Sequence, residues 1–249
     1  MKYKALILDV DGTLIPKRRE GIPSQKVVDA IEKATQYIHV GLATSRPLFF
    51  LSAILPSIAF SGPSIINGGA QIIDFPSKEI LWEKHLELKD VQKLSKELKN
   101  FKGKQIYLNN GNQDVPYDDK NIPDKLMQIY IAGFTMKEAD NIVNKLTTIS
   151  TNTAIHKVPS WQNEKTDIIV THALATKQHG ILKVAKILGI STHEIIGIGD
   201  GYNDFPLLMA CGLKVAMGNA VEDIKAIADY IAPPVEKDGV ADVIERFVL

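Results

Sequence analysis

Residues 5 to 14 read Ala5-Leu6-Ile7-Leu8-Asp9-Val10-Asp11-Gly12-Thr13-Leu14, an apolar run that ends in two acids and a glycine. Alternate residues of an extended chain share a face, so Asp9 and Asp11 project together where this strand ends. Open α/β sheets bind their ligands at the carboxyl ends of their strands. Two carboxylates held this close need a cation or a shared proton. Taken alone, the run also fits an Asx turn that closes a strand.

A second acidic segment repeats the pattern far along the chain: Ile195-Ile196-Gly197-Ile198-Gly199-Asp200-Gly201-Tyr202-Asn203-Asp204. Oxygen ligands from two strand ends suit a hard cation, and Mg²⁺ is more natural than Ca²⁺ because few protein ligands are on offer. Gly12 comes too early after Asp9 for an EF-hand loop. A dinucleotide-binding fingerprint also fails, because Tyr202 stands where its third glycine belongs.

Two further segments lie between these clusters. Val40-Gly41-Leu42-Ala43-Thr44-Ser45-Arg46-Pro47 is an apolar strand that ends in hydroxyls, with Pro47 placed for the first turn of a helix. A helix N-terminus beside a hydroxyl can bind an anion, although an ordinary N-cap explains the same residues. Lys177 opens a stretch to Leu188 with helical apolar spacing. A lysine in that position is more often on a solvated face.

Together the four segments resemble the haloacid dehalogenase superfamily of phosphotransferases, and in particular its Cof-like phosphatases. Residues 9–13 are similar to the first family motif, Thr44 to the second, Lys177 to the third and residues 199–204 to the fourth, in the family order. Ser45 and Gln178 each stand where the family usually has glycine. These departures concern the geometry of the phosphate loop and of the helix start, not the catalytic groups.

The resemblance implies a role for each acid. Asp9 would be the nucleophile that forms an aspartyl-phosphate, and Asp11 the general acid and base. Mg²⁺ would be held by Asp9, by the main-chain oxygen of Asp11 and by Asp200. Asp204 would either support the metal through water or orient Lys177.

The resemblance also implies a phosphate site. Thr44, Lys177 and Asn203 would surround the phosphoryl group with positive charge and hydrogen-bond donors, with Ser45 beside them. Arg46 either reaches the substrate or is solvated at a helix start. Residues 67–69, Asn67-Gly68-Gly69, resemble a family turn near the active site and equally fit a plain tight turn.

Composition fits such an enzyme. The chain has 249 residues, 45% of them hydrophobic, with 29 basic and 29 acidic side chains. This balance predicts no broad attraction to nucleic acid or to a membrane surface. Cys211 is the single cysteine, which excludes an intrachain disulfide. Because the sequence has neither a signal peptide nor a stretch long enough to span a bilayer, we expect a cytoplasmic protein.

The pattern of elements predicts an α/β protein with a Rossmann-like parallel-sheet core and an inserted α+β cap. Strands and helices alternate through residue 80 and again from about 177, which is typical of a parallel sheet covered on both faces. The predicted core is therefore 1–80 and 172–249, and the predicted cap is 81–171. The cap pattern reads αββαββ: helices at 88–99 and 136–149, strands at 105–109, 126–132, 153–158 and 166–171. Hinges are expected near 75–81 and 171–176.

The predicted function is Mg²⁺-dependent hydrolysis of a small phosphomonoester, such as a sugar phosphate. The predicted cap holds 13 Lys, no Arg and 12 acids, and Arg is the usual bidentate grip on a second anionic group. The polar loop 109–119 is the candidate for specificity. Phosphoglycolate is an alternative substrate, since Lys could take its carboxylate. A sugar phosphomutase and a non-catalytic phosphate-binding regulatory module are further alternatives.

Other conspicuous residues have simpler interpretations. Trp82, Trp161, His172 and His179 are expected in cap packing or on the surface. Residues 17–20, Lys17-Arg18-Arg19-Glu20, are expected in a solvated loop, and the most apolar helix is expected near 49–55.

Overall fold

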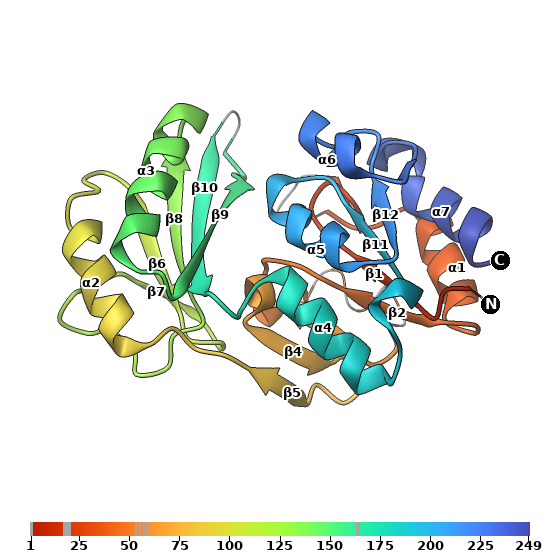
Figure 1. The fold of residues 1–249 in the computed structure, drawn as a ribbon, viewed down its shortest axis with the longest axis horizontal. Helices are drawn as coiled ribbons and strands as arrows, with labels where there is room; N and C mark the ends of the chain where they lie inside the picture. The colour runs from red at the N-terminus through yellow and green to blue at the C-terminus, as the bar shows by residue number, and fades with distance from the viewer. Residues whose placement is uncertain are drawn as a thin grey trace.

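The computed structural model of the chain describes residues 2–16, 21–52, 54, 56, 58, 60–162 and 165–249. The predicted loop 17–20 lies outside these residues. Two lobes stand side by side, and the chain crosses between them twice, after β5 and before α4 (Figure 1). Among the described residues, no helix has both the length and the apolar character that a membrane span requires.

A five-stranded parallel sheet forms the centre of the larger lobe. Its order is β13-β12-β11-β1-β2, with β1 between β11 and β2. The strands are β1 (Ala5–Leu8), β2 (His39–Leu42), β11 (Ile195–Gly199), β12 (Leu213–Ala216) and β13 (Tyr230–Ile231). Leu8 lies beside Leu42 and Ile198 in register. The carboxyl ends of β1, β2 and β11 therefore meet at one edge.

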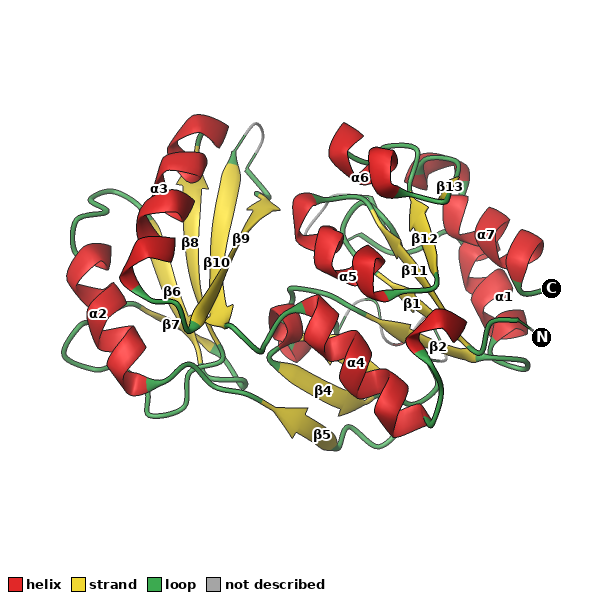
Figure 2. Cartoon of the chain, viewed as in Figure 1, coloured by secondary structure: helices red, strands yellow, loops and turns green. Residues whose placement is uncertain are grey.

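Helices cover both faces of this sheet (Figure 2). Leu6 and Leu8 pack in the apolar cluster with helices α1 (Gln25–Ala34) and α7 (Gly239–Phe247). Ala5 and Ile7, which alternate with them, pack with α4 (Lys177–Leu188), α5 (Phe205–Ala210) and α6 (Glu222–Ile227). Short 3₁₀ turns η4 (Thr192–Glu194) and η6 (Val235–Lys237) join these elements. The predicted α/β class, with a doubly covered parallel sheet, is confirmed.

A small antiparallel sheet extends this lobe toward the other. It contains β3 (Pro63–Ile66), β4 (Gln71–Asp74) and β5 (Ile80–Glu83), and Ala43 bridges to Ile65 beside it. The strand β5 crosses the predicted boundary at residue 80, because residues 80–83 pair with β4. Trp82 on β5 packs against the apolar cluster of α4 instead of inside the inserted lobe.

The inserted lobe is a five-stranded antiparallel sheet with helices on one face (Figure 1). Its strand order is β7-β6-β8-β10-β9. The elements are α2 (Leu88–Leu98), β6 (Gln105–Asn109), β7 (Asp114–Pro116), β8 (Gln128–Phe134), α3 (Met136–Ile149), β9 (Thr153–Pro159) and β10 (Thr166–His172). The predicted elements are present within about two residues. The strand β7 was missed, because the polar loop after Asn109 folds back as a hairpin in which Asn109 Nδ2 donates to Asp114 Oδ1 at 2.8 Å.

The chain after Pro47 differs from the prediction. A 3₁₀ turn, η1 (Leu48–Phe50), stands where a helix was expected, and residues 53 and 55 of the expected apolar helix lie outside the described residues. The Phe50 carbonyl accepts a hydrogen bond from Arg46 Nη1 at 3.0 Å, so a side chain satisfies it in place of a helical amide. The anion site predicted at a helix N-terminus therefore lacks its helix among the described residues.

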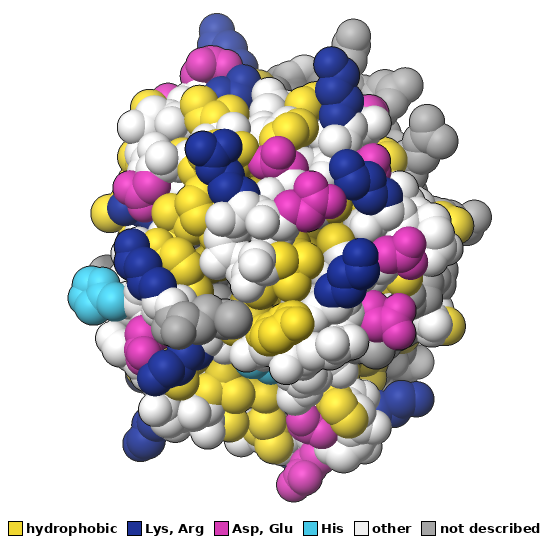
Figure 3. Space-filling model, turned by 90° about the vertical axis from the view of Figure 1, so that its right-hand side faces the viewer, with side chains coloured by type: hydrophobic (Ala, Val, Ile, Leu, Met, Phe, Trp, Pro, Cys, Tyr) yellow, Lys and Arg dark blue, Asp and Glu magenta, His cyan; other side chains and the backbone are white. Residues whose placement is uncertain are grey.

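The surface of the larger lobe carries both signs of charge. Figure 3 shows basic and acidic side chains interspersed over the face near α1 and α7. This mixture matches the equal numbers of basic and acidic residues.

Candidate active site

Three buried carboxylates come together at the edge where β1 and β11 end. Asp9 follows β1, and Asp200 and Asp204 follow β11, the last within the 3₁₀ turn η5 (Tyr202–Asp204). One carboxylate oxygen from each residue lies within 4.8 Å of the others. Parallel pairing of β1 with β11 brings together acids that are almost 200 residues apart in the sequence. Buried carboxylates at this spacing need a cation or a shared proton.

Lys177 supplies one positive charge to this cluster. Its Nζ donates to Asp9 Oδ1 at 2.6 Å and to Asp204 Oδ1 at 2.5 Å, and the side chain is 2% exposed. The lysine lies in the first turn of α4, where the hydroxyl of Thr176 caps the helix by accepting from the His179 amide. Burial would lower the pKa of Lys177, but the charges of Asp204 and Asp9 raise it above its ordinary value. The ammonium therefore stays charged.

At Asp9, burial and neighbouring acids outweigh the effect of the opposite charge on the pKa. Burial, and next the charge of Asp204, raise the pKa of Asp9 well above its ordinary value, although Lys177 acts to lower it. Two of the three acids, Asp9 and Asp204, share the one ammonium of Lys177. The donor set consists of hard carboxylate oxygens, which are the ligands that Mg²⁺ prefers. The residues present therefore fit a hard divalent cation.

Asp204 is held on both oxygens. Its Oδ2 accepts from the amides of Asp200 and Gly201 at 3.0 and 2.9 Å, while Oδ1 accepts from Lys177. A Cβ at Gly199 would lie 2.5 Å from the Asp204 Cβ, so glycine is needed for this carboxylate to fold back on the strand end. Of its two predicted roles, this geometry favours the orientation of Lys177.

Asp11 is not a member of this group of three acids and pairs with Arg46. Arg46 Nε donates to Asp11 Oδ2 at 2.9 Å and Nη2 donates to Oδ1 at 2.6 Å. The arginine side chain is 4% exposed, whereas that of Asp11 is 25% exposed. Of the two alternatives for Arg46, solvation at a helix start is wrong, because its buried guanidinium holds the carboxyl of Asp11 in a bidentate ion pair. A contact of Arg46 with substrate stays a prediction. A metal contact through the main-chain oxygen of Asp11 stays a prediction.

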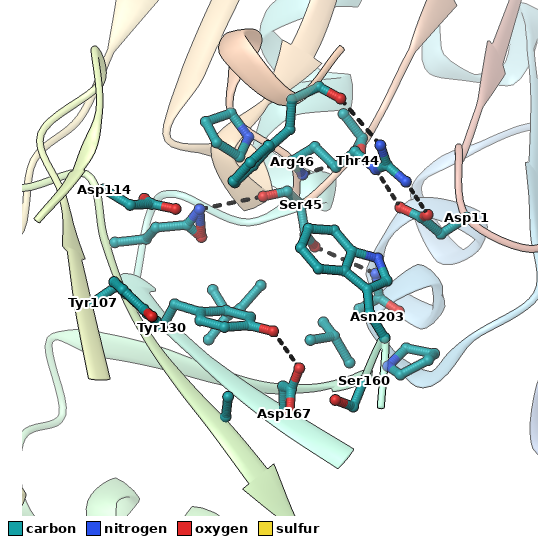
Figure 4. Close-up of a pocket in the computed structure, with 18 of the residues that line it drawn as sticks. Asp11, Thr44, Ser45, Arg46, Tyr107, Asp114, Tyr130, Ser160, Asp167 and Asn203 are labelled. Atoms are coloured by element: carbon teal, nitrogen blue, oxygen red, sulfur yellow. Dashed lines mark hydrogen bonds and ion pairs between the residues drawn. The ribbon is translucent and has the colours of Figure 1, made fainter. Parts of the chain in front are cut away.

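The loop after β2 presents the predicted phosphate-site hydroxyls. Thr44 is buried and its Oγ1 accepts from the Arg46 amide at 3.1 Å. Ser45 Oγ accepts from Asn203 Nδ2 at 3.4 Å, which joins this loop to η5. Thr44, Ser45 and Asn203 therefore lie together at the strand ends, as Figure 4 shows.

The turn η3 (Asn67–Gly69) supports this loop from behind. Its Asn67 and Gly68 amides donate to the carbonyls of Arg46 and Thr44, both at 3.0 Å. Gly69 has a φ of 110°, and a Cβ there would lie 2.3 Å from the carbonyl carbon of Thr176. The turn is thus both a tight turn and a neighbour of the site, because it connects the Thr44 loop to the start of α4.

A cavity of about 530 Å³ opens between the two lobes. The larger lobe contributes its predicted site residues other than Lys177 and Asp204, and the inserted lobe contributes one face of its sheet (Figure 4). The lining from the first lobe includes Asp9, Asp11, Thr44, Ser45, Asp200 and Asn203; the lining from the second includes Tyr107, Asp114, Gln128, Tyr130 and Asp167.

Direct contacts join the lobes at the rim of this cavity. Gln128 Nε2 donates to the Ser45 carbonyl at 3.2 Å. Trp161 packs edge-on against Phe50 with ring centroids 5.6 Å apart, and the Arg46 guanidinium lies 5.4 Å from the Trp161 ring. Trp161 was predicted to pack in the cap or lie on the surface, and its contacts cross to the other lobe.

Sequence reasoning did not single out the cavity residues Gln128, Tyr130 and Asp167. A usable signal was present: Gln128 and Tyr130 on β8, and Asp167 on β10, occupy alternate positions that face away from the helices. Polar residues repeated on one face of a half-covered sheet indicate a surface with a role.

The comparisons with known proteins agree with this geometry. The sequence profile of the haloacid dehalogenase-like hydrolases matches residues 6–244. A protein of Methanopyrus kandleri named phosphoglycolate phosphatase is 26% identical over 98% of this chain and 96% of its own length. A Bacillus subtilis protein named 5-amino-6-(5-phospho-D-ribitylamino)uracil phosphatase is 28% identical over 99% of this chain and 96% of its own.

A solved structure shows the same fold. A haloacid dehalogenase-like hydrolase from B. subtilis superposes with a TM-score of 0.84 at 20% identity, over 98% of this chain and 99% of that one. The profile match covers nearly the whole chain and includes all four segments that carry the buried acids, the lysine and the hydroxyls. The chain therefore belongs to the haloacid dehalogenase-like hydrolases, and it is a phosphatase of their Cof-like type.

Proposed function

We propose that the protein hydrolyses a small phosphomonoester, such as a sugar phosphate, with Mg²⁺ and through an aspartyl-phosphate on Asp9. One observation carries the proposal. Asp9 lines the cavity between the lobes, contacts Lys177 and belongs to a buried carboxylate cluster. A buried acid in this setting can act as a nucleophile toward phosphorus once positive charge surrounds it.

In the first step, an Asp9 carboxylate oxygen forms a bond to phosphorus as the bond from phosphorus to the leaving oxygen breaks. Asp11 donates a proton to that oxygen, and the alcohol departs. In the second step, Asp11 takes a proton from water, the water oxygen bonds to phosphorus, and the bond to Asp9 breaks. The balance is ester plus water giving alcohol plus phosphate. A well-placed general acid and base contributes about 10²- to 10⁴-fold.

The remaining residues bind and orient the phosphoryl group. Thr44 and Asn203 offer donors at the strand ends, and Lys177 neutralises charge beside Asp9. Asp9 and Asp200 would hold the metal, with Asp204 fixing Lys177 beside them. When bound, Mg²⁺ neutralises charge on the phosphoryl oxygens.

We infer that residues 81–171 act as the cap of this site, with hinges near 75–81 and 171–176. Its support is the sheet face that closes the cavity opposite Asp9, and the contacts of Gln128 and Trp161 to the other lobe. A closed cap excludes water from the phosphoryl group and positions the substrate.

A second candidate substrate is phosphoglycolate. It is favoured by the name of the relative from Methanopyrus kandleri, which matches nearly the full length of this chain. The catalytic groups would be the same for both substrates, so the lining of the cap decides between them.

The test is Mg²⁺-dependent hydrolysis of 4-nitrophenyl phosphate by the wild-type protein and by Asp9→Asn. We expect turnover in the first and none above background in the second, since the amide is a poor nucleophile. The matched control is Asp29→Asn, an exposed acid on α1. Wild-type turnover in Asp9→Asn would refute the mechanism.

The variant Asp11→Asn separates binding from chemistry. We expect it to lose turnover while it still binds Mg²⁺ and inorganic phosphate in calorimetry, because its side chain pairs with Arg46 and is not a member of the acid cluster. Equal loss of binding and turnover would contradict its role as acid and base.

A further inference from the structure

Residues 10–15 form a tight loop after β1, called here the Asp11 loop. Gly12 has a φ of 90°, and its amide donates to the Ile15 carbonyl at 2.7 Å. The Ile15 amide donates in turn to the Val10 carbonyl at 3.0 Å. These hydrogen bonds lie within the loop, so they fix its shape but not its position relative to the other acids of the site.

Asn219 makes a side-chain hydrogen bond to the Asp11 loop from a distant part of the chain. Its Nδ2 donates to the Gly12 carbonyl at 2.8 Å, and its Oδ1 accepts from the Val235 amide at 2.9 Å. Val235 opens the 3₁₀ turn η6. Both ends of the Asn219 amide are therefore used, and this arrangement fixes which end faces the loop.

The turn that carries Asn219 is bonded to the end of β11. The Met217 amide donates to the Gly199 carbonyl at 3.1 Å, and the Val221 amide donates to the Asp200 carbonyl at 3.0 Å. The backbone on each side of Asn219 is thus tied to the strand end that presents Asp200. Through its side chain, Asn219 connects this strand end to the loop after β1.

The same turn packs against the segment that donates to Asn219. A Cβ at Gly218 would lie 2.8 Å from the Pro234 nitrogen and 3.0 Å from the Ala232 carbonyl oxygen. The Ala232 amide donates to the Ala216 carbonyl at 2.8 Å, directly before the turn. The turn therefore has little room to shift, and Asn219 holds the Asp11 loop from a fixed point.

We propose that Asn219 is a positioning residue that sets the place of the Asp11 loop relative to Asp200 and thereby supports both cation binding and proton transfer by Asp11. The proposal rests on the proposed phosphatase function, in which Asp200 helps to hold the metal and Asp11 is the acid and base. Asn219 acts through the Gly12 carbonyl, one residue along the chain from Asp11.

The spacing between the two segments matters because both serve one site. The Thr13 hydroxyl of the Asp11 loop donates to Asp200 Oδ1 at 3.4 Å, so the loop directly contacts the acid proposed to hold the metal. Mg²⁺ demands near-ideal octahedral geometry, and ligands that shift apart bind it less tightly. A displacement of a catalytic group by about 1 Å can cost about a hundredfold in rate.

Hydrogen exchange tests the positioning in the metal-free, full-length protein. Asn219→Ala removes the donor to Gly12, and we expect amide exchange in the Asp11 loop to become about tenfold faster, since local opening becomes easier. The amides of β2 are the internal reference and should exchange at the wild-type rate. Wild-type exchange in the loop, or equal acceleration in β2, would overturn the positioning role.

Calorimetry tests the consequence for the metal. We expect the Kd for Mg²⁺ to rise about tenfold in Asn219→Ala, the size typical when a residue that orients a metal site is removed. A loss of stability alone would lower the number of binding sites and leave Kd unchanged. Wild-type Kd in this variant would overturn the link to the cation. The matched control is Asn141→Ala, exposed on α3, which should keep wild-type exchange and Kd.

Val235→Pro tests the other end of the Asn219 amide. Position 235 begins a 3₁₀ turn, and Pro234 has a ψ of 162°, so the backbone accepts a proline there while the donor to Oδ1 is lost. We expect the Kd for Mg²⁺ to rise in this variant also, but less than in Asn219→Ala. Wild-type Kd would overturn the part assigned to Val235.

Kinetics at saturating Mg²⁺ test the effect on Asp11. In Asn219→Ala, kcat on 2-hydroxyethyl phosphate, whose leaving alcohol needs a proton, should fall about tenfold, and kcat on 4-nitrophenyl phosphate should fall less. Equal losses would overturn the effect on proton transfer.

The positioning role and the proposed function fail separately. If the wild-type protein neither binds Mg²⁺ nor hydrolyses 4-nitrophenyl phosphate, the proposed function fails, and hydrogen exchange still decides whether Asn219 positions the loop. If the wild-type protein is active and Asn219→Ala matches it in loop exchange, Kd and kcat, the positioning role alone is refuted.

Discussion

The two sides of the cavity are built in different ways. On the catalytic side, buried Lys177 contacts both Asp9 and Asp204, and these residues come from strand ends and a helix start that the parallel sheet brings together. On the cap side, Asp114 and Asp167 are each held by groups of their own lobe. The comparison teaches that the acids and the lysine of the catalytic side are brought together from distant segments, while the acids of the cap side are held within one lobe.

The largest expected effect comes from breaking the catalytic cluster with Lys177→Met. Its loss leaves buried acids uncompensated, which costs about 3–5 kcal/mol of unfolding free energy in the absence of metal. Turnover should fall by roughly 10²- to 10³-fold because charge stabilisation is lost. Denaturant unfolding and kcat measure the two effects. Lys186→Met, exposed on the same helix, is the control, and wild-type behaviour of Lys177→Met would contradict the cluster.

The variant Arg46→Gln tests whether Arg46 assists catalysis by holding the carboxyl of Asp11. We expect kcat on an alkyl phosphate to fall about tenfold to a hundredfold. This loss is smaller than the roughly 10²- to 10⁴-fold rate contribution of a general acid, because Asp11 itself is still present. The loss should be smaller on 4-nitrophenyl phosphate, whose leaving group needs no proton. Equal losses on both substrates would show that Arg46 does not act through Asp11. Arg246→Gln, exposed on α7, is the control.

Protons and Mg²⁺ should compete for the carboxylates. In the metal-free protein, burial and the charge of Asp204 raise the pKa of Asp9. A carboxyl with a raised folded pKa stabilises the protein fully below its unfolded pKa of about 3.9, and this stabilisation is lost as pH rises through the folded value. This stabilisation should therefore decrease as pH rises, and it should contribute less to the Tm of the metal-free protein.

Mg²⁺ should restore that stability, so the increase in Tm on adding Mg²⁺ should be larger at pH 7.5 than at pH 5. Thermal unfolding with and without Mg²⁺ at both pH values measures it. Asp9→Asn removes the carboxyl and should reduce the dependence on pH. A larger Mg²⁺ effect at pH 5 would contradict the assignment.

The smallest effect is expected at the rim, from Trp161→Ala. The ring contributes an edge-on contact to Phe50 and a cation–π contact to Arg46, each worth about 0.5–1.5 kcal/mol. We expect KM to rise roughly three- to tenfold with kcat nearly unchanged. Steady-state kinetics on 2-hydroxyethyl phosphate measure this. Tyr37→Ala, exposed on the larger lobe, is the control, and a change confined to kcat would contradict a role in closing the cavity.

The sequence predicted the catalytic side better than the cap side, and the reason is local. Asp9, Thr44 and Asp200 each follow an apolar strand, so the strand pattern alone predicts their common edge. The residues of the cap face do not stand at the end of an apolar strand, so the sequence does not mark them in this way. Tyr107 and Asp167 lie within ordinary strands, and their orientation depends on which face the helices cover.

Arg46 shows the same limit at closer range. It stands in a segment that the sequence singled out, but its partner Asp11 lies 35 residues away and was not predicted, whereas the orientation of Lys177 by Asp204 was one of two roles that the family resemblance implied. The missed strand β7 and the short turn after Pro47 also depend on side-chain hydrogen bonds. Asn109 donates to Asp114 across the hairpin, and Arg46 donates to the Phe50 carbonyl in the turn.

By itself, then, the sequence determined the fold class, the order of the elements and the chemical types gathered at the strand ends, because hydrophobic periodicity and glycine turns act over a few residues. The tertiary structure alone decided which face of the cap looks into the cavity, which acid pairs with which base and how Trp161 meets Phe50. Those choices depend on the packing of segments distant in sequence, and local periodicity does not encode them.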